Sequence, residues 1–276
     1  MFEFQIQAEN NRARTGIFTT GIVAETQDHK VTLFFSGDKH AGENLADVLA
    51  KRAAELPPPI QMCDALSRNV PKLPQDMKLL LANCLTHCRR HFVEVAPNFP
   101  PECRYVLEML GEVYGNDDTA REQGMTPDQR LAHHQARSGP LMKQLREWGQ
   151  KQLDEHQVEP NSGLGQAIRY LLKHWEKLTL FLRQAGAPLD SNIVERALKK
   201  AILNRKNALF YKTRNGARVG DLFMSLIHTC EVCGGNPFDY LTELQRHAAE
   251  VKENPSAWMP WNYRATLEEA SMAKAA

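Results

Sequence analysis

Near its start, the chain has two short segments rich in β-branched and aromatic residues, at positions 17–23 and 31–35. A polar stretch, residues 25–30, separates them. Side chains of this kind favour extended backbone, and two such runs joined by a short polar linker are typical of a β-hairpin. The pattern therefore predicts two adjacent antiparallel strands.

Helix and strand patterns alternate after the predicted hairpin. Apolar residues recur at helical spacing over 45–56, until the prolines at 57–59 stop the pattern. Short apolar runs at 60–63 and 79–82 predict two more strands, and the second run leads into a helical pattern at 84–95. Strands that alternate with helices in this way are typical of the α/β class.

The middle and the end of the chain carry helical patterns only. Strand signals disappear over 102–185, where apolar positions repeat at helical spacing. Helices are also predicted at 222–233 and 238–251, around a Gly-Gly-Asn-Pro turn, whereas 258–263 lacks periodicity and is expected to pack across the surface. We expect one core with a large helical insertion, divided as follows: 1–98, first part of the core; 99–186, helical insertion; 187–250, completion of the core; 251–276, C-terminal tail.

The composition is that of an ordinary globular protein. Of 276 residues, 42% are hydrophobic and 24% charged, with a net charge of +1, which argues against a disordered chain. No apolar run reaches the ~20 residues that cross a bilayer, and the first residues lack the regions of a signal peptide. We therefore expect a cytoplasmic protein without a membrane partner, in which the six cysteines are reduced.

The segment at 188–207 carries the strongest functional signal. Pro188 ends the preceding pattern and good N-cap residues follow it, so a helix is predicted to begin here. Glu195 is the single carboxylate between residues 191 and 220. The same stretch holds eight cations: Arg196, Lys199, Lys200, Arg205, Lys206, Lys212, Arg214 and Arg218. Such a concentration of positive charge suits a polyanionic partner.

A purely structural interpretation of this segment stays open. Glu195 lies three residues after Asn192, which is the spacing of a capping box. In that motif the glutamate only closes the start of the helix, and the cap stabilises the fold by about 1 kcal/mol. A basic helix face is also often no more than a solvated surface.

Asp64 is a second candidate carboxylate, because it directly follows the predicted strand at 60–63. Ligand-facing groups of open α/β sheets gather at the carboxyl ends of strands. If the fold brings Asp64 and Glu195 together, their oxygens suit a divalent metal such as magnesium. The structural alternative for Asp64 is a turn in which its side chain accepts hydrogen bonds from nearby amides.

Four cysteines and histidines share one predicted helix face: Cys84, His87, Cys88 and His91. One face of one helix rarely surrounds a zinc ion tetrahedrally, and no second ligand pair lies nearby in the sequence, so we expect no zinc here. The pair Cys230 and Cys233 also lacks the context of a redox fold, so we interpret both as ordinary thiols.

Several linked motifs resemble those of the IS66 family of insertion-sequence transposases. The motifs of the second half are His174-Trp175-x-x-Leu178-Thr179, Pro188-Leu-Asp-x-Asn192-x-x-Glu195-Arg196-Ala-Leu, Arg205-Lys-Asn-x-Leu-Phe210, Ser225-Leu-Ile-x-Thr229 and Asn236-Pro-x-x-Tyr-Leu241. Those nearer the two ends are Phe18-Thr-Thr-Gly-Ile22, Cys84-x-x-His87-x-Arg-Arg-x-Phe92 and Pro260-Trp-Asn262. They follow one another in order over nearly the whole chain.

The resemblance implies a DNA transposase with a ribonuclease-H-like mixed sheet and an Asp-Asp-Glu metal triad. Asp64 would be its second acid and Glu195 its third, both as ligands of Mg²⁺ or Mn²⁺ in DNA strand cleavage and strand transfer. The cations that would bind phosphates are Arg196, Lys199, Arg205 and Lys206. The roles of three motif residues stay open: Cys84, His87 and Asn192.

The chain also departs from the family pattern. The family's first Asp would lie on a strand just before Phe18, but no aspartate precedes Asp28. We therefore expect a carboxyl-terminal catalytic part that lacks the first acid and is inactive alone, and whose sheet could lack its first strand. A separate polypeptide could supply the missing part, and a homo-oligomer is conceivable. The alternative is a non-catalytic remnant that binds DNA or a transposase. Leu85 replaces an aromatic residue and Lys199 an arginine of the family.

Overall fold

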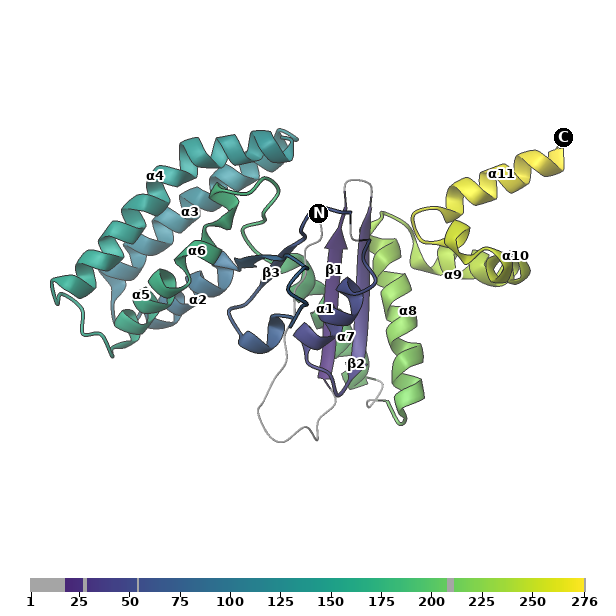
Figure 1. Ribbon diagram of the computed structural model, residues 1–276, viewed down its shortest axis with the longest axis horizontal. Coiled ribbons are helices and arrows are strands. Elements are labelled where there is room, and N and C mark those ends of the chain that lie inside the picture. The colour runs from purple at the N-terminus through teal and green to yellow at the C-terminus, as the bar shows by residue number, and fades with distance from the viewer. Residues whose placement is uncertain (1–17, 27–28, 54, 208–210, 276) are drawn as a thin grey trace. The chain divides into compact units, whose positions relative to one another are not determined.

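A computed structural model of the protein describes residues 18–26, 29–53, 55–207 and 211–275 (Figure 1). Four strands and eleven α-helices are found in these residues. The chain is therefore of the mixed α/β class that its sequence predicted. Among the residues described, no helix is both long and apolar enough to cross a membrane.

The chain folds into two compact units. Unit 1 comprises Met1–Leu56, Arg68–Leu73 and Asn192–Ala276. Unit 2 comprises Pro57–Ser67 and Pro74–Ser191. The strands of the described residues pair within these units as two small sheets, one antiparallel and one parallel.

Unit 1 contains the predicted hairpin, formed by β1 (Phe18–Glu25) and β2 (Lys30–Gly37). The strands pair antiparallel along their full length, with Phe18 opposite Gly37 at the open end. This prediction from β-branched and aromatic residues is confirmed for the described part. Ile17, the first residue of the expected strand, lies outside it.

Helix α8 (Arg214–Val232) lies alongside the outer edge of β2, as Figure 1 shows. Side chains spaced one helical turn apart accept hydrogen bonds from the backbone amides of this edge. The bonds join Thr32 to Thr229 Oγ1 at 3.0 Å, Phe34 to Ser225 Oγ at 2.9 Å and Ser36 to Asp221 Oδ2 at 2.6 Å. Unpaired strand edges promote unwanted pairing, so the helix here takes the place of a neighbouring strand.

Helix α7 (Asn192–Asn207) packs its apolar stripe against the hairpin, and it begins in the segment where the N-cap residues predicted a start. The buried residues of this cluster are Val23, Phe34, Val194, Ala197, Leu198 and Ala201. Those that belong to α7 recur at three- and four-residue steps, so they form one buried face of the helix.

Helix α1 (Ala41–Leu49) is shorter than predicted, because the apolar spacing continued to Leu56. After Leu49 the backbone forms tight turns instead, with the amide of Arg52 bonded to the carbonyl of Leu49 at 3.0 Å. Leu56 is 45% exposed, so no buried face supports additional helical turns.

The C-terminal part of unit 1 contains α9 (Pro237–Arg246), α10 (Ala248–Glu253) and α11 (Tyr263–Ala275). Residues 259–262 are irregular, as the lack of periodicity predicted. Their placement across the surface is only partly right, because Trp258 is buried and accepts a 2.9 Å hydrogen bond from Tyr240 through its carbonyl. Apolar positions are sparse in α11, which explains why periodicity did not reveal that helix.

Unit 2 contains the parallel pair β3 (Ile60–Cys63) and β4 (Leu80–Asn83), and its register places Cys63 beside Asn83. Both strands were predicted from short apolar runs. All four residues of β3 are buried, as expected for a strand of a parallel sheet.

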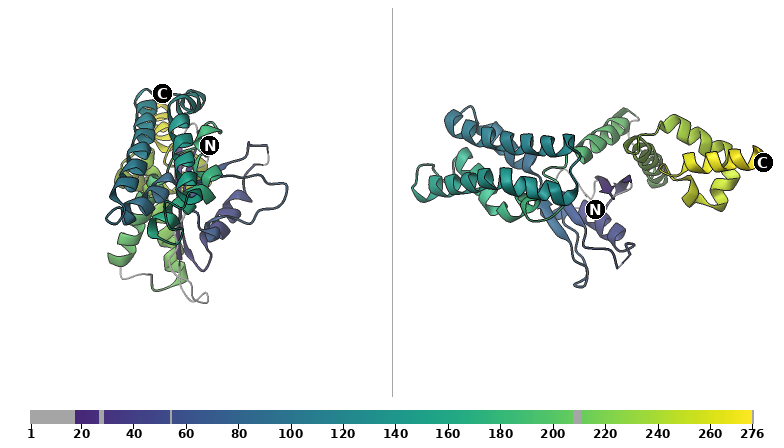
Figure 2. Two further views of the ribbon diagram at one scale, coloured as in Figure 1. Left: turned by 90° about the vertical axis from the view of Figure 1, so that its left-hand side faces the viewer. Right: turned by 90° about the horizontal axis from the view of Figure 1, so that it is seen from above.

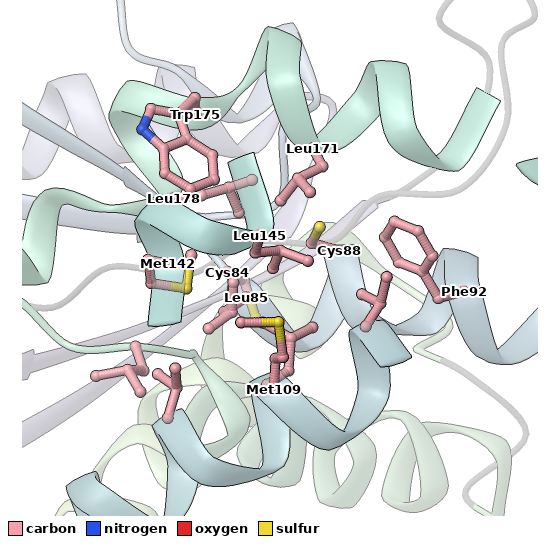
Figure 3. Close-up of a cluster of buried hydrophobic side chains, with 14 of the residues drawn as sticks. Cys84, Leu85, Cys88, Phe92, Met109, Met142, Leu145, Leu171, Trp175 and Leu178 are labelled. Carbon is pink, nitrogen blue, oxygen red and sulfur yellow. The ribbon is translucent and has the colours of Figure 1, made fainter. Parts of the chain in front are cut away.

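The rest of unit 2 is helical, as the loss of strand patterns predicted. Its helices are α2 (Leu85–Val95), α3 (Pro100–Glu122), α4 (Pro127–Asp154), α5 (Gly163–Lys173) and α6 (Trp175–Leu178). Helices α3 and α4 lie side by side in both views of Figure 2. Figure 3 shows their apolar core, in which Met109, Met142 and Leu145 meet Cys88 of α2 and Leu171 of α5.

A buried polar cluster centred on Asp117 links α3 to α4. Its Oδ1 accepts hydrogen bonds from His134 at 3.0 Å and from Arg130 at 2.7 Å. His134 also contacts Ser138 at 3.0 Å, and Arg130 donates to the carbonyl of Ala187 at 2.9 Å. Burial raises the pKa of Asp117, but the bond from His134 and the charge of Arg130 outweigh it and lower the pKa to about 2.

Candidate catalytic and DNA-binding residues

Asp64 lies at the carboxyl end of β3, directly after Cys63, where the sequence predicted it. Its side chain is only 8% exposed, and its Oδ1 accepts a 3.3 Å hydrogen bond from the amide of Leu66. This bond is the turn geometry of the structural alternative. A carboxylate bonded in this way keeps further lone pairs for other ligands, so the turn does not exclude a metal-binding role.

Two thiols lie close to Asp64. Burial raises the pKa of Cys63 to about 12, and the charge of Asp64 adds to this shift. Cys84 follows β4, and its amide donates a 3.0 Å hydrogen bond to the carbonyl of Cys63. Burial also raises the pKa of Cys84, although hydrogen bonds from Ser191 oppose the shift. Both cysteines are therefore neutral thiols near pH 7.

Residues at the start of α2 form hydrogen bonds with the segment that precedes α7. The amide of Leu85 donates to the carbonyl of Leu189 at 2.9 Å, and the Thr86 hydroxyl bonds the Asp190 carboxylate at 3.3 Å. Thr86 also bonds the hydroxyl of Tyr114 at 2.8 Å. These contacts all lie within unit 2, and they fasten residues 189–191 beside the end of β4.

Glu195 lies in the first turn of α7 and is partly buried. The helix begins at Asn192, so Ser191 occupies the N-cap position. Glu195 follows Ser191 by four residues, one more than the spacing of a capping box. The capping role and the metal-binding role of Glu195 both stay predictions.

Asp64 belongs to unit 2 and Glu195 to unit 1. The structure therefore describes each carboxylate in its own surroundings, and their meeting at one metal ion stays a prediction. Within the described residues, no group of three or more His, Cys, Asp or Glu side chains is gathered in a way that could hold a metal.

The predicted phosphate-binding cations on α7 are Arg196, Lys199, Arg205 and Lys206. Arg196, Lys199 and Lys206 are exposed, whereas the side chain of Arg205 lies outside the described part. The neighbouring Lys200 is bound to Glu231 at 2.9 Å. Lys200 is also exposed, with 58% of its side chain accessible, and among the described residues it differs from the other three exposed cations in this salt bridge.

The residues of the cysteine and histidine motif have separate surroundings. Cys84 and Cys88 are fully buried in the core of unit 2, where Figure 3 shows their sulfur atoms among leucines and methionines. His87 is partly buried, and His91 contacts the ring of Tyr170. Two cysteines of the motif thus pack in the core, whereas the roles of Cys84 and His87 beyond packing stay open.

The sequence argument missed a group of three partly buried rings in unit 2. His91 contacts Tyr170 at 4.4 Å between ring centroids, and Tyr170 contacts His174 at 4.7 Å. The sequence did contain a signal, because His174 opens one of the family motifs and His91 lies within another, the motif from Cys84 to Phe92. Helical periodicity alone does not bring these residues of α2 and α5 together.

Comparisons with known proteins identify similar sequences. The family described as "Transposase IS66 family" matches residues 4–219. The uncharacterized protein y4jD of Sinorhizobium fredii (strain NBRC 101917 / NGR234) is 33% identical over 192 residues, which are 68% of this chain and 37% of that protein. The uncharacterized protein y4qI of the same strain is 30% identical over 187 residues, 67% of this chain and 34% of that protein.

This chain spans about a third of the length of these relatives. No solved structure matches it significantly. The family match covers most of the chain and includes both candidate carboxylates and the basic helix α7. On this evidence the chain belongs to the IS66 family of transposases.

Proposed function

We propose that this chain acts as the catalytic segment of a DNA transposase that cleaves and joins strands at the ends of an insertion sequence. The observation that carries the proposal is Asp64, a carboxylate at the carboxyl end of a buried parallel strand, in a chain that a transposase family matches over residues 4–219. In such sheets, the carboxyl ends of the strands are where ligands bind. The order hairpin, helix, strand, strand and helix also suits a ribonuclease-H-like core.

Asp64 and Glu195 would hold Mg²⁺ or Mn²⁺, because these hard cations prefer carboxylate oxygens. The bound metal would activate water or a DNA 3′ hydroxyl and stabilise the leaving oxygen. Chain connectivity supports the pairing, because Leu189 and Asp190, which bond to the start of α2 just after β4, precede Glu195 by only a few residues.

The exposed cations of α7 would bind the phosphates of the DNA near these carboxylates. Arg196 and Lys199 follow Glu195 within one turn and both are exposed. Contacts of cations with phosphate strengthen binding without reading the base sequence, and salt weakens them steeply. Other residues would therefore recognise the base sequence of the insertion-sequence ends.

Mn²⁺ titration of the whole chain, followed by calorimetry, tests the metal site. We expect Asp64→Asn and Glu195→Gln each to weaken Mn²⁺ binding at least about tenfold, because each removes one charged ligand. Asp118→Asn is the matched control, since Asp118 is exposed and pairs with Arg121 on α3. Unchanged Mn²⁺ affinity in both site variants would contradict the proposal.

Strand transfer on insertion-sequence-end DNA tests the reaction itself. The sequence offers no candidate for the first acid of the triad before Asp28, so we expect this chain alone to show no transfer with Mg²⁺. Transfer by the chain alone that Glu195→Ala abolishes would overturn this expectation, although it would support the site.

A second candidate function is a non-catalytic module that binds DNA or a transposase. It is favoured by the exposed cations of α7, which could contact phosphates without a metal. Such a module would bind DNA equally well with and without Mg²⁺ and after Asp64→Ala. A chain with no salt-sensitive binding to DNA would exclude it.

A further inference from the structure

The three rings of His91, Tyr170 and His174 form a continuous aromatic group in unit 2, which we call the ring cluster. The centroid distances are 4.4 Å and 4.7 Å, and the ring planes are inclined by 49° and 52°. All three residues are partly exposed. The cluster therefore offers aromatic surface to a ligand, whereas rings such as Phe92 are fully buried in the core.

The ring cluster lies within electrostatic range of Asp64. Burial raises the pKa of Tyr170, and the nearby Cys88 and the carboxylate of Asp64 raise it further. The order of the elements agrees, because β3 ends at Cys63 beside Asn83, the end of β4, and α2, which carries His91, begins at Leu85. The ring cluster therefore involves the helix that starts beside the end of the strand that Asp64 follows.

Positive charge surrounds much of the ring cluster. Burial lowers the pKa of His174, and the nearby Lys173 and Lys177 lower it further. Burial also lowers the pKa of His91, with Arg90 acting in the same direction and Glu94 in the opposite one. Lys173 and Lys177 are both exposed. Partly exposed rings flanked by cations are the arrangement with which proteins bind single-stranded nucleic acid.

We propose that the ring cluster binds unpaired nucleotides of a DNA strand, with bases against the rings and phosphates against Lys173 and Lys177. In a duplex the faces of the bases are covered by stacking, so a ring reaches a base only where the strand is unpaired or the base is extruded. The inference rests on the proposed function, since strand ends at a cleavage site are where unpaired nucleotides arise.

Binding of a fluorescein-labelled thymidine oligonucleotide of about 20 nucleotides, compared with a duplex of equal length, tests the inference. The experiment uses the full chain without divalent metal. Tyr170→Leu is expected to weaken binding of the single strand about tenfold, because stacking on one ring contributes about 1–3 kcal/mol. Binding of the duplex is expected to change little.

Two further variants separate stacking from folding. Tyr170→Phe keeps the ring and should bind the single strand like the unmodified chain. Tyr105→Leu is the matched control, because Tyr105 is also a partly buried tyrosine of unit 2 but packs against Trp148 at 5.3 Å. If thermal denaturation shows that Tyr170→Leu does not fold, His174→Leu replaces it, with the same expected loss.

The inference is overturned if loss of the ring leaves single-strand binding unchanged, or weakens single strand and duplex equally. The variant Asp64→Asn tests the ring cluster independently of the proposed metal site. Single-strand binding that depends on Tyr170 but survives Asp64→Asn supports the ring cluster, even if the Mn²⁺ titration finds no metal site. Loss of single-strand binding in Asp64→Asn to the same extent as in Tyr170→Leu would contradict it.

Discussion

Thr229 completes the backbone hydrogen bonding of Thr32, a residue 197 positions earlier in the chain. Its Oγ1 accepts the amide of Thr32 at 3.0 Å and donates to the carbonyl of the same residue at 3.2 Å. A neighbouring strand would normally satisfy both groups. One buried hydroxyl of α8 thus replaces a strand at the edge of β2, and it couples the hairpin to the helix.

Replacement of Thr229 by valine should destabilise unit 1 measurably. Thr229→Val preserves the shape but leaves a buried amide and a buried carbonyl of Thr32 without partners, at a cost of about 1–3 kcal/mol. Urea denaturation monitored by circular dichroism measures the change. Thr242→Val is the control, because the Thr242 hydroxyl bonds only the carbonyl of Phe238, one turn earlier in its own helix. Equal stability of the two variants would show that Thr229 does not support the edge.

The contact of α8 with the edge of β2 could not be predicted from the sequence, although the elements themselves could. The hairpin itself follows from the β-branched and aromatic residues of β1 and β2, because their preference is local. Ser225 and Thr229 belong to a recognised family motif, but their spacing of four residues says only that they share a helix face. Which strand edge that face meets depends on tertiary packing, so the sequence did not reveal the partners.

In the candidate site, too, local features were predicted from the sequence and long-range contacts were not. The position of Asp64 after a strand was predicted because a short apolar run identifies a buried strand and its end. The start of α7 near Glu195 was predicted from N-cap residues. The ring contacts of His91 with Tyr170 were not predicted, because they join two helices separated by a long stretch of chain and have no periodic signature.

Asp117 should make the free energy of unfolding depend on pH under acidic conditions. Its pKa in the folded chain is lowered to about 2, from an ordinary value near 3.8. A lowered pKa contributes stability that is complete above the ordinary value and is lost as the pH falls toward the folded value. We therefore expect Asp117→Asn to cost about 2 kcal/mol near pH 7 and to flatten the loss of stability between pH 4 and pH 2.

Urea denaturation at a series of pH values checks this expectation. Asp118→Asn serves as the control, because Asp118 is the adjacent residue and its side chain is 60% exposed. Its replacement should change stability little, as is usual for an exposed ion pair. A pH profile of Asp117→Asn that parallels the unmodified chain would contradict the role of the buried cluster.

Two glycines of unit 2 should respond oppositely to alanine. A Cβ at Gly165, in the first turn of α5, would lie 2.4 Å from the carbonyl oxygen of Glu159 and 2.7 Å from that of Pro160. Backbone must shift to accept it, so we expect Gly165→Ala to destabilise the chain by about 2 kcal/mol or more. A Cβ at Gly111 of α3 meets nothing within 4 Å, and Gly111→Ala should stabilise by about 0.5–1 kcal/mol.

Melting temperatures of the two alanine variants, compared with the unmodified chain, measure this contrast. The glycines lie in helices of the same unit, so each variant is the control for the other. A decrease for Gly165→Ala together with an increase for Gly111→Ala is expected. Similar shifts in one direction would mean that helix propensity, and not the close backbone approach at Gly165, decides the outcome.

The lysines of α7 should contribute unequally to DNA binding. All three lysines of the comparison, Lys199, Lys200 and Lys206, are exposed, but the Lys200 ammonium is already paired with Glu231 at 2.9 Å. Each cation that neutralises a phosphate adds about one unit to the slope of log affinity against log salt concentration. We expect Lys199→Gln and Lys206→Gln each to reduce this slope by about one unit, measured by fluorescence anisotropy with duplex DNA. Lys200→Gln is the matched control on the same helix, and it should leave the slope nearly unchanged. If all three variants reduced the slope equally, DNA affinity would depend on the total charge of the helix. The proposal of specific phosphate contacts by Lys199 and Lys206 would then be wrong.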